Sequence, residues 1–300
     1  MEASMGWTEN DITDQSGRTA IITGANSGIG FETARALTKA GAHVVMACRN
    51  PERGQAAVAK LVLGQPNAKI ELGIVDLSDL SSIREFAAEQ LAKHSRLDLL
   101  INNAGVMMTP YTKTADGFEL QFGTNHLGHF ALTGLLLERL QATSGSRVVN
   151  VASLAHKFGK MRFDDLQWEK RYDRTAAYGQ SKLSNLLFSS ELQRRLSDSN
   201  SSVMALSAHP GWTATNLQNT VSLFKMMNPI FAMKPMGGAL PTLFAATSAE
   251  AEPNGYYGPS GLGEIRGAPG PAKRAKKAQD SEAARRLWDV SQELTGVHYL

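Results

Sequence analysis

The chain has 300 residues, of which 42% are hydrophobic and 20% are charged, a composition typical of a folded globular protein and not of a disordered one. Its 31 basic and 28 acidic residues leave a formal net charge of +3, which is too small to indicate a nucleic-acid-binding or anionic-membrane surface. The single cysteine, Cys48, can form no internal disulfide and is too few for a cysteine-based zinc site. We therefore expect a reducing compartment, the cytoplasm.

The chain begins with a polar stretch, residues 1–16, which we interpret as an N-terminal extension. Acidic residues such as Glu2 and Glu9 stand where an export signal would need basic and apolar ones. No run of 18 consecutive apolar residues occurs anywhere in the sequence. We expect neither an export signal nor a membrane span.

From residue 17 onward, short apolar runs rich in β-branched residues alternate with longer amphipathic segments, a pattern typical of βαβ units. The expected strands are residues 19–23, 43–48, 70–75, 97–101, 147–151 and 203–207. The expected helices are residues 29–40, 52–63, 80–93, 116–140 and 176–196. Because runs such as Leu99-Leu100-Ile101 are apolar on both faces, we expect a doubly wound α/β domain whose parallel sheet is covered by helices on both sides. Open sheets of this kind often exceed about 250 residues in one domain, so a single domain over residues 17–300 is expected.

The end of the chain, residues 253–300, differs from this pattern and is expected to be a C-terminal extension. It starts with a Gly- and Pro-rich stretch, residues 253–271. The basic segment 271–277 is interpreted as a solvated loop and not as an anion-binding patch. Residues 280–294 place Ala284, Leu287 and Trp288 at helical spacing, and we expect this final helix to pack against the sheet.

A glycine-rich turn follows the first expected strand and opens the first helix. A dinucleotide needs such a turn, because its pyrophosphate must approach backbone N–H groups and a helix N-terminus without obstruction by Cβ atoms. The spacing is G-x-x-x-G-x-G and departs from the G-x-G-x-x-G fingerprint. A merely tight strand-to-helix turn is the alternative. The residues expected to contact the cofactor here are Gly24, Asn26, Ser27, Gly28, Ile29 and Gly30.

The end of the second expected strand discriminates between cofactors. An acidic residue at this point binds the adenosine ribose of NAD, whereas an arginine accommodates the 2′-phosphate of NADP. The strand ends Cys48-Arg49, and a guanidinium pairs well with phosphate oxygens. Arg49 therefore predicts NADP(H). The alternative is that Arg49 only caps a surface loop before Pro51.

Further motifs now make the chain similar to a known family. Asn102-Asn103-Ala104-Gly105, Asn125, Ser153, Tyr178-Gly-Gln-Ser-Lys182 and Pro210-Gly211 follow one another in the chain, and together with the glycine turn they resemble a classical short-chain dehydrogenase/reductase over residues 17–250. The stretch 116–130, Ser153-Leu-Ala-His156 and Leu287-Trp288 resemble the branch of retinol dehydrogenases, WW-domain oxidoreductases and protochlorophyllide reductases. The resemblance implies a Rossmann-type sheet with strand order 3-2-1-4-5-6-7. The N-terminal membrane anchor of the vertebrate retinol enzymes is missing, which argues against a membrane-bound retinoid role.

Tyr178 and Lys182 are four residues apart on an expected helix, so their side chains share one face. A phenol with a pKa near 10 is a weak acid–base catalyst at neutral pH, and lowering its pKa toward 7 needs about 4 kcal/mol of differential stabilisation. The Lys182 ammonium and an oxidised nicotinamide could together provide it. The resemblance implies that Tyr178 exchanges a proton with the substrate oxygen, that Ser153 hydrogen-bonds this oxygen, and that Lys182 and Asn125 form a proton relay.

The resemblance also implies cofactor contacts at the ends of other strands. Asp76 is expected to bind the adenine amine, and Pro210 with Gly211 to turn the backbone around the nicotinamide. Tyr178 and Lys182 are expected near the nicotinamide ribose. The remaining expected contacts are Leu77, Asn102, Ala104, Gly105, Thr213 and Thr215.

The substrate-binding segment is expected at residues 216–236, which are rich in Leu, Phe and Met and carry two lysines as their only charges. Phe158, Phe163 and Trp168 are expected to form the opposite wall, and this composition predicts an apolar aldehyde or ketone as substrate. Met107 and Met108 either line this pocket or fill core gaps. His126 and His129, three residues apart, have no evident third ligand, so no metal site is expected.

Three functions remain open at this point. The first is an NADP(H)-dependent oxidoreductase acting on a carbonyl or alcohol, the second is a reductase of an activated C=C bond, and the third is a non-catalytic NADP-binding sensor or scaffold. A small-molecule substrate is expected, with no nucleic acid and no membrane span. The resemblance further implies a homodimer or tetramer in which the helices that carry Asn125 and Tyr178 pack across a two-fold axis. The sequence does not specify the substrate or the physiological direction.

Overall fold

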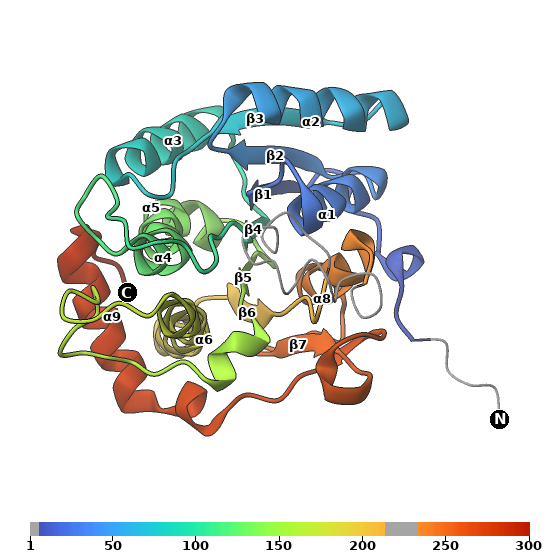
Figure 1. Cartoon of the computed structure of the whole chain (residues 1–300). Helices are drawn as coiled ribbons and strands as arrows, with labels where there is room; N and C mark the ends of the chain where they lie inside the picture. The colour runs from blue at the N-terminus through green and yellow to red at the C-terminus, as the bar shows by residue number, and fades with distance from the viewer. Residues whose placement is uncertain (1–5, 214–232) are drawn as a thin grey trace.

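The computed structural model describes residues 6–213 and 233–300, and they form one eight-stranded sheet between two layers of helices (Figure 1). The strands are β1 (Thr19–Thr23), β2 (His43–Cys48), β3 (Ile70–Ile74), β4 (Leu99–Asn102), β5 (Arg147–Val151), β6 (Met204–Ala208), β7 (Tyr256–Pro259) and β8 (Pro269–Pro271). The longer helices are α1 (Gly28–Lys39), α2 (Pro51–Gly64), α3 (Leu80–Lys93), α5 (Gly128–Gln141), α6 (Arg174–Asp198), α8 (Pro235–Thr247) and α9 (Ser281–Thr295). Each of the six expected strands is present to within two residues.

The sheet has the order β3-β2-β1-β4-β5-β6-β7-β8. The first seven strands are parallel, which confirms the expected Rossmann-type sheet and its order. The eighth strand, β8, was not expected and pairs antiparallel with β7, with Tyr257 opposite Pro271. Both β7 and β8 lie in the Gly- and Pro-rich stretch, where proline is tolerated because β8 is an edge strand.

The core consists of two apolar layers, one on each face of the sheet. Ala20 and Ile22 of β1 pack toward α1, α2 and α8, whereas Ile21 between them packs toward α3, α5 and α6. All three side chains are buried. This alternation within one strand explains why the strand sequences are apolar on both faces.

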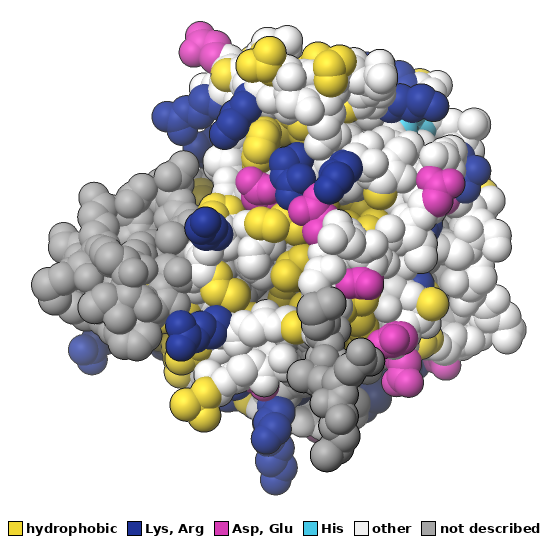
Figure 2. All heavy atoms as spheres, turned by 90° about the vertical axis from the view of Figure 1, so that its right-hand side faces the viewer, with side chains coloured by type: hydrophobic (Ala, Val, Ile, Leu, Met, Phe, Trp, Pro, Cys, Tyr) yellow, Lys and Arg dark blue, Asp and Glu magenta, His cyan; other side chains and the backbone are white. Residues whose placement is uncertain are grey.

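The N-terminal extension continues onto the outside of α1 and α8. The Trp7 ring packs edge-on against Phe244 of α8 with centroids 5.5 Å apart. Glu9, in the short helix η1 (Glu9–Asp11), pairs with Arg35 of α1 at 2.7 Å, and Arg35 also pairs with Glu32. Figure 2 shows this side of the molecule, where basic and acidic side chains lie side by side above exposed hydrophobic ones.

The expected helix 116–140 starts later than predicted. Gly117 has a left-handed φ of +85°, and the Glu119 carboxylate accepts hydrogen bonds from the backbone N–H groups of Gln121 and Phe122 at 2.9 and 2.7 Å. The helical residues therefore begin at α4 (Leu120–Phe122). A π-helical turn, η2 (Gly123–Leu127), connects α4 to α5 and contains Asn125.

One expectation for the C-terminal extension is wrong, and a second holds only in part. α9 lies on α6 and α5, not on the sheet, because these two helices already cover that face (Figure 1). Its Trp288 is buried between Phe130 and Phe188. The basic segment 271–277 is not simply a solvated loop, because the Arg274 guanidinium donates hydrogen bonds to Ser190 Oγ and to the Asn254 carbonyl.

Candidate active site

A cavity of about 510 Å³ lies at the carboxyl ends of the parallel strands, where open α/β sheets bind ligands. The expected site residues that line it are Gly24, Asn26, Ser27, Gly28, Ile29, Gly30, Arg49, Asp76, Leu77, Ala104, Gly105, Ser153, Tyr178, Lys182, Pro210, Gly211 and Thr213. Asn102 and Asn125 are not among the lining residues, and Thr215 lies outside the described residues. One cavity thus collects residues from six strand ends, β1 to β6, and from α6.

The glycine turn brings the backbone close to this cavity. Gly24 has a φ of +65°, which side-chain-bearing residues rarely adopt. A Cβ on Gly30 would lie 2.5 Å from both the Gly24 carbonyl oxygen and Asn103 Nδ2. Ser27 precedes α1, and its hydroxyl makes no capping hydrogen bond to any described residue. The N-terminus of α1 therefore faces the cavity with its N–H groups accessible.

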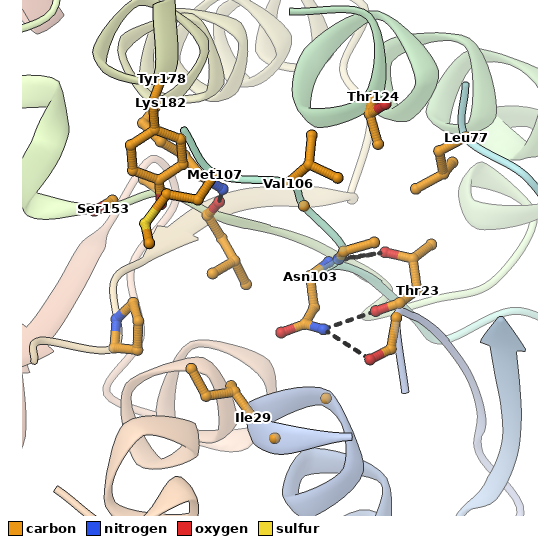
Figure 3. Close-up of a pocket in the computed structure, with 18 of the residues that line it drawn as sticks. Thr23, Ile29, Leu77, Asn103, Val106, Met107, Thr124, Ser153, Tyr178 and Lys182 are labelled. Atoms are coloured by element: carbon orange, nitrogen blue, oxygen red, sulfur yellow. Dashed lines mark hydrogen bonds between the residues drawn. The ribbon is translucent and has the colours of Figure 1, made fainter. Parts of the chain in front are cut away.

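Asn103, which the sequence analysis did not single out, holds this turn in place (Figure 3). Its side-chain Nδ2 donates to the Thr23 carbonyl at 2.8 Å, and its backbone N–H donates to Thr23 Oγ1 at 2.9 Å. The expected contact, Asn102, lies one residue earlier in β4 and points the other way. Its amide donates to Thr133 Oγ1 and Asn150 Oδ1, and it is buried.

Asn125 lies behind the cavity and holds the loop that forms one of its walls. Its Oδ1 accepts from the Val106 N–H at 2.7 Å, and its Nδ2 donates to the Val106 carbonyl and to Ser181 Oγ, both at 2.9 Å. The side-chain amide is therefore fully engaged with the protein. The backbone carbonyl of Asn125 lies 3.1 Å from His129 Nδ1.

The histidines of this region have structural partners. Burial lowers the pKa of His129 to about 4, so it is neutral. Its Nδ1 lies 3.1 Å from the Asn125 carbonyl and its Nε2 lies 2.9 Å from Thr23 Oγ1, so it links the π-helical turn to the glycine turn. His126 Nε2 lies 2.8 Å from Ser291 Oγ of α9.

Arg49 lies at the rim of the cavity and is exposed. The helix that follows is capped by Asn50, whose Oδ1 accepts from the Arg53 N–H at 2.8 Å, so capping is not the role of Arg49. Among the described residues, the Arg49 guanidinium has no hydrogen-bonding or ionic partner. Asp76, on the same side of the cavity, uses one oxygen to accept from Ser78.

Ser153, Tyr178 and Lys182 meet at the other end of the cavity, with Met107 beside them (Figure 3). Lys182 is buried, its Nζ donates to the Val151 carbonyl at 3.0 Å, and it lies 5.9 Å from the centre of the Tyr178 ring. Burial lowers the pKa of Lys182 to about 8. The serine side chain comes from the residue that caps the short helix η3 (Leu154–Lys157).

The electrostatics of Tyr178 differ from the expected lowering of its pKa. Burial raises the pKa of Tyr178 to about 12, and a hydrogen bond with Ser153 lowers it only in part. The reason is that the phenolate loses water at a site of low dielectric, which penalises the charged form. In the protein alone, Tyr178 is therefore a proton donor at neutral pH.

The expected apolar wall is only partly present. Phe158 lines the cavity, together with Met107, Met108 and Leu154. Phe163 and Trp168 do not line it: Phe163 stacks against Arg286, and Trp168 is buried under Arg162. Residues 216–232 of the expected substrate segment lie outside the described residues.

This sheet, with its cavity at the strand ends, defines a Rossmann-type fold with a ligand site at the edge where such sheets bind ligands. Residues 18–225 match the family model for short chain dehydrogenases. The chain belongs to the short-chain dehydrogenase family, in its retinol dehydrogenase branch, and acts as an oxidoreductase on CH–OH groups.

The relatives support this assignment over nearly the whole chain. Mouse (Mus musculus) retinol dehydrogenase 12 is 44% identical over 291 residues, which cover 94% of this chain and 88% of that protein. Human (Homo sapiens) retinol dehydrogenase 13 is 44% identical over 293 residues, covering 94% and 85%. A crystal structure of an uncharacterised protein from Mycobacterium paratuberculosis is 43% identical with a TM-score of 0.84, covering 99% and 100%. Among the described residues, no helix combines the length and apolarity that crossing a membrane requires.

Proposed function

We propose that the protein is an NADP(H)-dependent oxidoreductase that transfers hydride between the nicotinamide and a carbonyl or alcohol group, with Tyr178 as acid and base. The observation that carries this proposal is the arrangement of residues along this cavity. At one end lie the glycine turn and Arg49, and at the other end lie Ser153, Tyr178 and Lys182. A dinucleotide that spans the cavity would reach both ends.

The residues present fit such a cofactor. The turn at Gly24 and Gly30 has no room for a Cβ, and Ser27 leaves the α1 N-terminus accessible to the pyrophosphate. Arg49 has no partner among the described residues. Its guanidinium is therefore suited to bind a 2′-phosphate through two charge-assisted hydrogen bonds. Asp76 keeps one carboxylate oxygen for the adenine amine, since the described structure uses only its Oδ1.

Bound NADP(H) would supply the hydride and, in its oxidised form, a positive charge near the phenol. In the reductive direction, Tyr178 donates its proton to the substrate oxygen as negative charge develops there. Ser153 donates a hydrogen bond to the same oxygen and stabilises that charge. Lys182, held at the Val151 carbonyl, is cationic near neutral pH, so its charge stabilises the Tyr178 phenolate that this step leaves. The Lys182 ammonium then returns a proton to the phenolate, and solvent reprotonates Lys182 along the backbone of Asn125.

We further propose an apolar aldehyde or ketone as the substrate. Phe158, Met107, Met108 and Leu154 line the cavity near the three reactive side chains, and apolar walls with few polar groups are typical of sites for hydrophobic ligands. The named relatives are retinol dehydrogenases. A cytoplasmic location stays a prediction, which cell fractionation would check.

The direct test is cofactor consumption by the purified protein with apolar and polar aldehydes, ketones and enones, using NADPH and NADH in parallel. We expect turnover with NADPH and an apolar carbonyl, and loss of this turnover in Tyr178→Phe. Analysis of the products separates reduction of C=O from reduction of an activated C=C bond. Tight NADPH binding without turnover of any carbonyl or enone would contradict the proposal and indicate a cofactor sensor.

A further inference from the structure

The C-terminal extension lies directly against the back of the active site. The carbonyl of Ile265 accepts the Trp212 N–H at 2.9 Å, next to the Pro210-Gly211 turn. Gly211 has a φ of +63°, and a Cβ on it would lie 2.4 Å from the Ile265 oxygen. The loop around Ile265 and the turn at the nicotinamide end of the cavity are therefore in close backbone contact.

Glu264, next to Ile265, connects three separate segments through one carboxylate. Its Oε1 accepts from the Lys273 N–H at 2.8 Å. Its Oε2 accepts from Lys157 Nζ at 3.1 Å and lies 3.5 Å from His209 Nε2. Lys157 ends the η3 helix that Ser153 caps, and His209 immediately precedes Pro210. The η3 helix next to Ser153 and the turn at Pro210 thus both contact the Glu264 side chain.

The hydrogen bonds of two histidines fix opposite tautomers, since a neutral imidazole has one donor and one acceptor. His156 Nε2 accepts from the Ala275 N–H at 3.2 Å, so its Nδ1 carries the proton and donates to the Ser153 carbonyl at 2.7 Å. His209 Nδ1 accepts from the Gly211 N–H at 3.2 Å, so its Nε2 carries the proton and faces Glu264.

The charge states agree with these tautomers. Burial lowers the pKa of His156 and brings that of His209 down to about 4, so both are neutral at physiological pH. Partial burial acts to raise the pKa of Glu264, but the Lys273 N–H and the Lys157 ammonium outweigh it and hold the pKa below its usual range. A carboxylate therefore faces the His209 N–H.

We propose that His156 and Glu264 are positioning residues through which the C-terminal extension orients the active site. His156 holds the backbone of Ser153 and thereby the hydroxyl that contacts the substrate oxygen. Glu264, through His209, holds the Pro210-Gly211 turn against the nicotinamide. This inference rests on the proposed function, because it assigns Ser153 and the turn their roles in it. His156 belongs to η3 and Glu264 to the C-terminal extension, and neither side chain lines the cavity. Both therefore act on the site through Ser153 and the Pro210-Gly211 turn and do not touch the substrate.

Substitution of His156 and substitution of Glu264 are expected to affect different kinetic constants. His156→Leu removes the donor to the Ser153 carbonyl, and misplacement of a reactive group costs rate more than binding. We expect kcat to fall about tenfold with the KM for NADPH unchanged. His156→Asn, whose amide N–H can still donate to the Ser153 carbonyl, is expected to recover most of this loss. Glu264→Gln weakens the hold on the turn, and we expect the KM for NADPH to rise about tenfold with a smaller change in kcat.

A matched control is Glu169→Gln, which removes a carboxylate that pairs with Lys113 at 2.9 Å, away from the cavity lining. Partial unfolding would lower kcat alone in every variant, so a KM effect in Glu264→Gln together with a kcat effect in His156→Leu separates positioning from stability. Thermal unfolding of each variant provides the second readout.

The experiment distinguishes this inference from the proposed function. If the wild type turns over, Tyr178→Phe does not, and both network variants match Glu169→Gln, the inference is wrong and the proposed function stands. If the wild type binds NADPH without turnover, nicotinamide fluorescence measures the dissociation constant, and an unchanged value in Glu264→Gln overturns the inference. If NADPH does not bind at all, both are overturned.

Discussion

The protonation state of Tyr178 predicts how the two directions of the reaction depend on pH. Because burial raises its pKa to about 12, the phenol stays protonated across the neutral range. Reduction needs that proton and is expected to be nearly independent of pH from 6 to 7.5, below the pKa of about 8 of Lys182. Alcohol oxidation needs the phenolate, so its kcat/KM is expected to rise with pH over the same range. Initial rates in both directions check this, and an oxidation optimum at pH 7 would contradict it.

Arg49 carries the prediction of cofactor preference. A charge-assisted hydrogen bond contributes about 1.5–3 kcal/mol, so Arg49→Ala is expected to lower kcat/KM for NADPH by roughly tenfold to a hundredfold. The value for NADH, which lacks the 2′-phosphate, should not change. Arg53→Ala, one turn into α2 and away from the cavity lining, is the control. Equal losses of kcat/KM with NADPH and NADH would show that Arg49 does not bind the 2′-phosphate.

At the level of single residues, the sequence predicts which segments line the cavity better than it predicts which side chains point into it. The Asn102-Asn103 pair shows why. Strand alternation points neighbouring side chains to opposite faces, and nothing in the sequence says which of two asparagines faces the cavity. Phe158 lines the cavity, whereas Phe163 and Trp168 point away from it. The sequence could not predict this difference, because the loop that carries them has no periodic pattern of apolar residues.

At the level of elements, the π-helical turn and α5 bury two neutral histidines, and this makes the fold sensitive to acid. Burial lowers the pKa of His126 to about 3 and that of His129 to about 4, below the 6.5 of an exposed histidine. A group with a lowered folded-state pKa stabilises the fold fully above its unfolded-state pKa, and this stability is lost as the pH falls. At pH 5 the loss is about 2 kcal/mol for each histidine.

Urea unfolding at pH 7.5 and pH 5 measures this effect. We expect the free energy of unfolding to fall by several kcal/mol between the two pH values, a large share of the about 5–15 kcal/mol that a native domain has. His126→Phe, which places an apolar ring beside Phe122 and Phe188, should reduce the pH dependence. An equal pH dependence in this variant would show that His126 does not contribute.

The elements of the Rossmann-type half follow from the sequence because each has its own periodicity and its own boundary signal. Asp79 and Asp173 cap α3 and α6 with side chains that accept backbone N–H groups. The C-terminal strands lack such signals. β8 is a Pro-Gly-Pro edge strand, and a Cβ on Gly258 of β7 would overlap the His209 ring. Their pairing is set by tertiary contacts that no local pattern encodes.

At the scale of the whole molecule, α9 occupies the surface through which we expected two copies to associate. α6 is buried almost continuously from Gly179 to Gln193, with Ser190 only partly exposed, and α9 packs along it. The Arg195 guanidinium lies 4.6 Å from the centre of the Trp288 ring and closes the end of this contact. A second copy packed on α6, as the family resemblance implies, would meet α9 on that face.

We therefore predict that no dimer forms through the face of α6 that α9 covers, and that any assembly larger than one chain of 32.4 kDa uses another face. The physical reason is that exposing this face would remove Leu287 and Trp288, both about 1% exposed, from apolar surroundings, and burial of such side chains contributes about 1.5–3 kcal/mol each. Sedimentation equilibrium over a range of concentrations measures the mass. A dimer whose dilution releases hydrogen-exchange protection along α6 would contradict the prediction, whereas a dimer with unchanged protection there would place the interface on another face.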